Sequence, residues 1–218
     1  MSLKIKSSIV RKYLMALSGL FLVIFLLQHF TINLTSVFSK EMFNFLSHFM
    51  GNNPLIQFVL QPVLIFGVVF HFIMGFILEF KNRSSRNQKY YNFKGKANSS
   101  WISRNMILSG IVILSFLGLH FYDFWIPEMQ YKYIEFLPEN PDRYFDELVH
   151  KFDSLPRVII YNISFIFLSL HLLHGFSSSF QTIGFNNKYT ISLKFFTISF
   201  SIIIPLGFIL IALFHYLN

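Results

Sequence analysis

Cysteine is absent from the chain and charged residues are few. The absence of cysteine excludes disulfides, iron–sulfur ligation, Cys-based zinc sites and haem attached through a C-x-x-C-H motif, so histidine or oxygen must hold any metal. Charged residues make up 13% of the 218 positions and hydrophobic residues 54%, whereas about 25% charged residues is typical of a soluble domain. This composition excludes an ordinary soluble domain and indicates an integral membrane protein.

Five apolar segments have about the 20 residues that an α-helix needs to cross roughly 30 Å of hydrocarbon. They lie at about 12–35, 55–80, 105–126, 157–182 and 191–216. The first resembles a signal peptide, but its apolar core is longer than a typical h-region and no A-x-A-like cleavage site follows, so we interpret it as a helix. Pro205 predicts a kink in the fifth span. No internal repeat or low-complexity linker interrupts the chain, and the sequence predicts one all-α membrane domain over residues 1–218.

The charges of the loops predict the orientation in the membrane. Segment 81–104 has no acid and seven basic residues, namely Lys81, Arg83, Arg86, Lys89, Lys94, Lys96 and Arg104. Segment 127–156 has seven acids and three basic residues. By the positive-inside rule the N-terminus and segment 81–104 are cytoplasmic, and five crossings place the C-terminus outside. The same topology signals account for the net charge of +8 without nucleic acid. A short amphipathic helix is predicted near 142–152.

The eight histidines differ in their predicted depth. His48 and His150 fall in external segments and His215 lies at the outer end of the fifth span, so these three are expected to be solvated or interfacial. The first four spans each have one histidine 16 to 18 residues from the start of the helix, namely His29, His71, His120 and His174. At about 1.5 Å per residue, each of these lies about 24–27 Å along its crossing.

The direction of each crossing sorts these four histidines into two pairs. His29 and His120 share a level near the outer face, because their helices enter from the cytoplasm. His71 and His174 share a level near the inner face, because their helices enter from outside. Two neutral imidazoles that face each other across a bundle supply both axial nitrogens of a six-coordinate haem. The pattern therefore predicts a five-helix bundle that encloses two b-type haems.

The surroundings of these histidines leave some alternatives open. Gly67 and Gly75 lie four residues either side of His71, where they would let a flat macrocycle approach the helix. His171 lies about 4.5 Å and about 60° from His174, so only one of these two fits the inner level; the other would contact a haem edge or line a proton route. The alternative to haem binding is a cofactor-free membrane scaffold or proton relay, because a lone intramembrane histidine is commonly a packing residue.

Several stretches together resemble a known family: RKYLMALSGLFLVIFLLQHFTINL, SHFMGNNPLIQ, SSWISRNMILSG, LGLHFYDFW and HLLHGFSSSFQTIGFNNKYT. They resemble the cytochrome b subunit of succinate dehydrogenase, in the five-helix, two-haem class that also includes fumarate reductases. The likeness extends over about residues 7–210. It implies one haem ligand on each of the first four helices, with His29 and His120 on the outer haem and His71 and His174 on the inner haem.

The resemblance also implies partners and a substrate. It implies a bacterial inner membrane, a cytoplasmic flavoprotein that interconverts succinate and fumarate, an iron–sulfur protein, and electron transfer to quinone, menaquinone in this class, near the outer face. Related enzymes place an acidic residue near the outer haem after the first helix; here SKEMFNFLSH offers Glu41, with Asn44 and His48 nearby. Segment 81–104 and residues 98–105 are candidates for a docking surface, and Arg104 and Lys81 for partners of haem propionates. Plain interfacial anchoring is the alternative for these basic residues, and the direction of catalysis stays open.

Overall fold

The computed structural model describes residues 8–84, 105–185 and 189–218, and every regular element within these ranges is a helix. Five helical stretches are long and apolar enough to cross a membrane. They are α1 (Ser8–Thr35), η1 with α3 (Ile56–Leu60 and Gln61–Ser84), α6 with its extension (Met106–Ile134), α9 (Leu155–Thr182) and α10 (Thr190–Leu217). The expectation of five helices long and apolar enough to span a membrane is therefore confirmed.

Local sequence signals account for several helix ends. α9 begins directly after Ser154 with Pro156 in its first turn, where a missing N–H costs nothing. α10 stays helical through Pro205, which is buried in the bundle. Between these two helices Gly184 has a φ of 91°, a left-handed conformation that glycine adopts without strain. The hairpin of α9 and α10 thus turns at a glycine.

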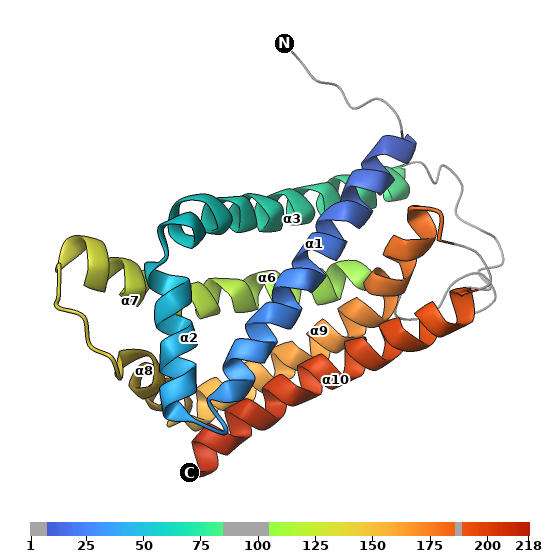
Figure 1. Cartoon of the computed structure of the whole chain (residues 1–218). Helices are drawn as coiled ribbons and strands as arrows, with labels where there is room; N and C mark the ends of the chain where they lie inside the picture. The colour runs from blue at the N-terminus through green and yellow to red at the C-terminus, as the bar shows by residue number, and fades with distance from the viewer. Residues whose placement is uncertain (1–7, 85–104, 186–188) are drawn as a thin grey trace.

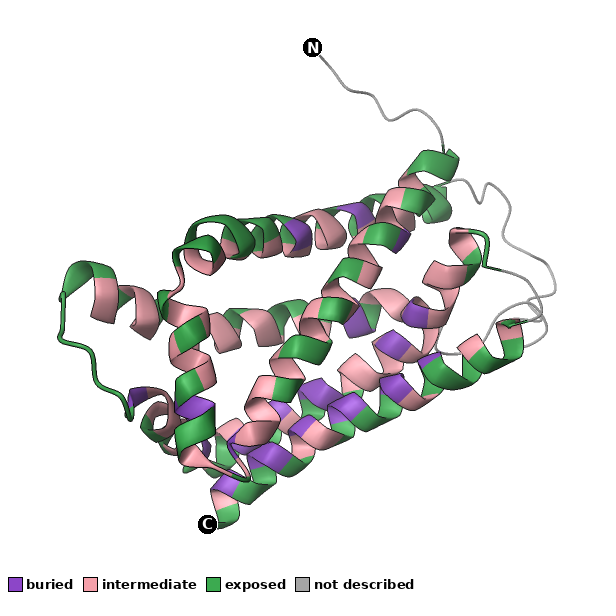
Figure 2. Ribbon diagram, in the orientation of Figure 1, coloured by how far each residue is buried: buried purple, intermediate pink, exposed green. Residues whose placement is uncertain are grey.

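The best-buried part of the bundle is the contact between α9 and α10 (Figure 2). Its core includes Val158, Phe165 and Phe176 from α9 and Phe208 and Ile211 from α10. α1 crosses this pair and also contacts α3, while α6 packs on α9 (Figure 1). α1 and α3 keep many large apolar side chains exposed. Such surfaces are costly in water but not against lipid.

Two amphipathic helices cover the bundle end at which α1 stops, which we call the α2 end. α8 (Arg143–Phe152) lies where a short amphipathic helix was predicted. α2 (Lys40–Asn52) was not predicted; Ser39 caps it by accepting a hydrogen bond from the N–H of Met42 at 3.1 Å. The buried Asn44 accepts a hydrogen bond from the N–H of Phe145 at 2.9 Å and thereby joins α2 to α8.

The third span extends further than the predicted end at 126. α6 (Met106–His120) continues through η2 (Phe121–Trp125), α7 (Ile126–Met129) and η3 (Gln130–Ile134). η2 and η3 are π-helical turns, which are rare and occur frequently at functional sites. η2 begins directly after His120.

His215 does not lie where the sequence placed it. We expected a solvated or interfacial side chain, but His215 is only 4% exposed. Its Nε2 lies 2.8 Å from Ser36 Oγ, and its ring lies 5.6 Å from that of Phe145. The expectation was wrong because the turn after α1 and helix α8 fold over the end of α10.

Candidate functional site: two histidine pairs in the bundle

His29 of α1 and His120 of α6 lie side by side toward the α2 end. Their ring centroids are 5.7 Å apart and the ring planes are nearly perpendicular, at 84°. Aromatic rings surround both: Phe25 and Phe208 lie next to His29, and Phe116, Phe124 and Tyr161 next to His120. These rings form an aromatic wall around the His29–His120 pair, and both histidines are half-buried.

The hydrogen bonds of this pair are incomplete. Asn33 Nδ2 lies 3.4 Å from His29 Nε2, a weak contact, and donates a stronger bond of 2.8 Å to the backbone carbonyl of His29. Within the described ranges, the buried Nδ1 of His120 has no hydrogen-bond partner. A buried polar atom without a partner is costly, so it marks a place where a ligand, a water or a rearranged side chain is needed.

A buried carboxylate lies beside His120, three residues further along the chain. Asp123 has a fully buried side chain, and its Oδ2 accepts bonds of 2.9 Å from both Arg157 Nε and Tyr161 OH. Asp123 was not among the predicted site residues. The signal was available in LGLHFYDFW, because an acid within an apolar span is rarely without a function.

His71 of α3 pairs with His171 of α9. Their ring centroids are 6.3 Å apart, with an interplanar angle of 65°. Ser18 Oγ lies 3.0 Å from His71 Nδ1, and Ser109 Oγ lies 3.1 Å from His171 Nδ1. The two serines come from α1 and α6, so four helices meet around the His71–His171 pair.

The serine hydroxyls determine which ring nitrogen has the proton. Each hydroxyl has a single hydrogen, and each donates it to a backbone carbonyl one turn earlier: Ser18 to Met15 at 2.9 Å and Ser109 to Met106 at 2.8 Å. At the histidine each Oγ therefore accepts, and the Nδ1–H of the imidazole donates. Both histidines then keep a lone pair on Nε2, which is the state that a metal requires.

His174, the residue predicted to face His71, lies one turn beyond His171 and is partly buried. Among the described residues, no hydrogen bond or ring contact joins His174 to His71. The structure brings His171 against His71 instead. The role of His174 as a haem ligand stays a prediction, but the geometry favours His171.

Small residues line the His71–His171 pair on three helices. A Cβ at Gly19 of α1 would lie 3.4 Å from His71 Cε1, a Cβ at Gly110 of α6 would lie 3.9 Å from His171 Cε1, and Gly175 of α9 lies against Met106. Gly67 faces the ring of Phe21 and Gly75 faces Met15, so these two glycines let α1 approach α3. The glycines next to the imidazoles thus belong to α1, α6 and α9 rather than to α3.

Both pairs have a spacing that fits two axial ligands of one metal. A metal–imidazole bond is about 2.0 Å, so two imidazoles on opposite sides of one metal have centroids on the order of 6 Å apart. The observed 5.7 and 6.3 Å lie close to this value. The part of the chain that the structure describes has no cluster of three or more His, Asp or Glu side chains suited to a bare metal ion. Two nitrogens per site suit a metal whose equatorial ligands come from a macrocycle.

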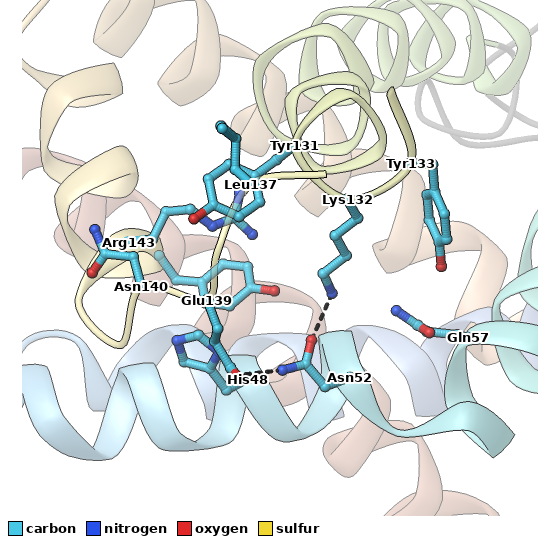
Figure 3. A pocket seen from close by; sticks show the side chains of 11 residues that line it. His48, Asn52, Gln57, Tyr131, Lys132, Tyr133, Leu137, Glu139, Asn140 and Arg143 are labelled. Atoms are coloured by element: carbon cyan, nitrogen blue, oxygen red, sulfur yellow. Dashed lines mark hydrogen bonds and ion pairs between the residues drawn. The ribbon is translucent and has the colours of Figure 1, made fainter. Parts of the chain in front are cut away.

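A polar pocket of about 370 Å³ lies at the α2 end (Figure 3). Lys132 points across it, donating to Gly51 O at 2.7 Å and to Asn52 Oδ1 at 2.8 Å, and also pairs with Glu128. Arg143 pairs with Glu128 and lies over the ring of Tyr144 at 4.5 Å. These hydrogen bonds and ion pairs form the pocket wall and connect α2, η3 and α8.

Glu41, the predicted quinone-site acid, is exposed in the first turn of α2. Its own backbone N–H and the hydroxyl of Ser39, which donates at 2.9 Å, hold the pKa of the Glu41 carboxyl below its usual value. Glu41 does not line the pocket, whereas His48 does. Within the described ranges, no hydrogen bond or ion pair joins Glu41 to either histidine pair.

Most of the basic docking segment falls outside the described residues, which stop at Ser84 and resume at Asn105. Residues 98–104 and Arg104, the candidate propionate partner, belong to that stretch. Lys81 lies in the last turn of α3 and is exposed.

Comparisons with known proteins found no family model, no curated protein and no solved structure that matches the chain. The class that the structure itself defines is a helical protein with five spans long and apolar enough for a membrane.

Proposed function

We propose that this chain is the dihaem cytochrome b subunit that anchors a succinate:quinone oxidoreductase in the membrane. The observation that carries the proposal is the presence of two histidine pairs, each contributed by two different helices and each with the spacing of two axial ligands. The resemblance of the sequence to that family supports the same assignment. Haem bound at the two pairs supplies one-electron transfer along the bundle.

The residues of the chain have distinct tasks in this proposal. His29 and His120 hold the haem nearer the outer face, and His71 with His171 or His174 holds the haem nearer the inner face. Ser18 and Ser109 keep the Nε2 lone pairs of His71 and His171 available by accepting their Nδ1–H. The aromatic wall around the His29–His120 pair supplies the apolar lining that a haem requires.

The partners and the direction follow from the family resemblance alone. The cytoplasmic partners are a flavoprotein that interconverts succinate and fumarate and an iron–sulfur protein, and the membrane-soluble substrate is a quinone, menaquinone in the two-haem class. The membrane is the bacterial inner membrane, with the N-terminus in the cytoplasm and the C-terminus outside. The same complex working as a quinol:fumarate reductase uses the same residues.

The absorption spectrum of the purified chain tests the proposal. We expect sharp α and Soret bands on reduction and two haems per chain by pyridine haemochrome. His150→Ala is the matched control, because His150 is exposed on α8 and its replacement should leave two haems. A chain without these bands after expression with haem supplied would reject the proposal and favour the cofactor-free scaffold or proton relay.

A further inference from the structure

Two buried polar atoms without partners lie on the same stretch of helix. They are Nδ1 of His120 and Oδ1 of Asp123, and neither has a hydrogen-bond partner among the described residues. One is a nitrogen that has a proton whenever Nε2 binds a metal, and the other is a carboxylate oxygen. A donor and an acceptor that are both unpaired and both buried are complementary.

The ring of Tyr161 shows that the two groups share one neighbourhood. Its centroid lies 6.4 Å from that of His120, and its hydroxyl donates to Asp123 Oδ2 at 2.9 Å. Arg157 Nε occupies the same Oδ2 at 2.9 Å. The carboxylate is thus held by one oxygen, while the other is left for a further donor.

The charge of Arg157 makes Asp123 a strong acceptor. The guanidinium pairs with the carboxylate and is itself 27% exposed, so the ion pair reaches toward the surface while the acid stays fully buried. A hydrogen bond to an ionised acceptor is about twice as strong as one between neutral groups. The π-helical turn that holds Asp123 starts immediately after His120.

We propose that Asp123 is the positioning residue of His120, with Oδ1 accepting the Nδ1–H of the imidazole through one water or after a rotation of either side chain, because the two atoms are not within hydrogen-bond distance in the structure. This inference rests on the proposed function, because it assigns His120 Nε2 to a haem iron. A carboxylate at the far nitrogen makes an imidazole a stronger electron donor than a serine hydroxyl does. Asp123 therefore lowers the potential of the haem at the His29–His120 pair relative to that at the His71–His171 pair.

The rival interpretation is an ion pair that only ties the extension of α6 to α9. In that case replacement of Asp123 lowers the stability of the protein but leaves the electronic state of the haem unchanged. The midpoint potential and the low-spin EPR signal of the ferric haem are readouts that a purely structural contact would not move.

The experiment uses a His71→Ala background, in which only the haem of the His29–His120 pair is expected to remain. We expect Asp123→Asn to raise its midpoint potential by at least 59 mV, the one-electron equivalent of a tenfold change in the ratio of reduced to oxidised haem. The EPR signal should shift as well. Asp153→Asn is the matched control, because it removes the same charge from an exposed site and should leave both readouts unchanged.

Other outcomes separate the two hypotheses. If the chain with native Asp123 binds no haem, the proposed function fails. If Asp123→Asn binds haem with unchanged potential and EPR signal, only the role of Asp123 fails. Should Asp123→Asn not fold, Asp123→Glu keeps the charge for Arg157 but moves the oxygens by one methylene. A shifted EPR signal at equal haem content then supports the contact, and an unchanged signal overturns it.

Discussion

The two histidine pairs differ in what surrounds the Nδ1 atoms of their imidazoles. At the His71–His171 pair, two serine hydroxyls accept the Nδ1 protons. At the His29–His120 pair, the Nδ1 of His120 has no partner among the described residues, and a buried carboxylate, that of Asp123, follows three residues further along the chain. One pair of histidines thus lies next to neutral hydroxyl groups, and the other lies near a charged group. Identical axial ligands would therefore give two haems of different potential.

The largest expected effect comes from removal of the pair nearer the α2 end. His29→Ala and His120→Ala should each reduce the haem content from two to one per chain, because a single imidazole cannot supply both axial ligands. Pyridine haemochrome and the reduced α band measure this directly. Retention of two haems in both variants would show that these two rings pack against each other without binding a cofactor.

The loss of one haem should distinguish between His171 and His174, the two histidines of HLLH. We expect His171→Ala to lose the haem held with His71, because the structure places the His171 ring 6.3 Å from the His71 ring. His174→Ala is the matched control and should keep two haems. The opposite result, with haem lost only from the His174 variant, would show that His174 is the ligand, as the sequence pattern predicted.

The charged cluster at the α2 end should contribute to stability rather than to haem binding. The side chain of Arg143 is 7% exposed and pairs with Glu128 and Glu147, so Arg143→Gln removes one ion-pair partner from each acid and leaves Glu128 with Lys132 alone. Removal of one partner from a buried ion pair costs about 3–5 kcal/mol.

Denaturant unfolding in detergent measures this effect, with Arg83→Gln as the control. Arg83 pairs with Glu79 within α3 while 68% exposed, and such a pair contributes only about 0.3–0.5 kcal/mol. Equal losses in the two variants would mean that the cluster around Arg143 is no more stabilising than a surface pair.

Sequence patterns predicted the parts of the molecule that follow from hydrophobicity and helical rise. Five apolar runs predicted five helices, and counting along two crossings in the same direction put His29 and His120 at one level. The choice between His171 and His174 could not be made in this way, because residues three apart lie on nearly the same face of a helix. What distinguishes the two histidines is a contact with another helix, because Ser109 of α6 lies within hydrogen-bond distance of His171.

Two features of the α2 end also could not be predicted from sequence patterns. α2 has an apolar stripe too short for a membrane span, so a search for spans passes over it. The π-helical turns after His120 add residues without any local signature, and they moved the end of the third span from the predicted 126 to Ile134. Asp123 lies in the first of these turns, so its position depends on a backbone feature that periodicity does not predict.

The smallest effect concerns Glu41, for which the sequence proposed a role in quinol protonation at the same end. The pKa of Glu41 is lowered, so its carboxylate stays ionised as the pH falls below the usual range for glutamate. Any contribution of the charged form to stability or to proton acceptance is therefore present above the unfolded-state pKa and is lost only as the pH falls through the lower folded-state value.

We expect Glu41→Gln to keep two haems, because the side chain is exposed and hydrogen-bonded to Ser39. Succinate:quinone activity of the whole complex, measured across this acidic range with a soluble-dye assay as control, then isolates the proton step. A quinone rate that falls severalfold at unchanged dye rate would support Glu41 as the acid of the quinone site. Equal rates in the variant and the native complex would assign that step to another residue, and the first to test would be His48 in the neighbouring pocket.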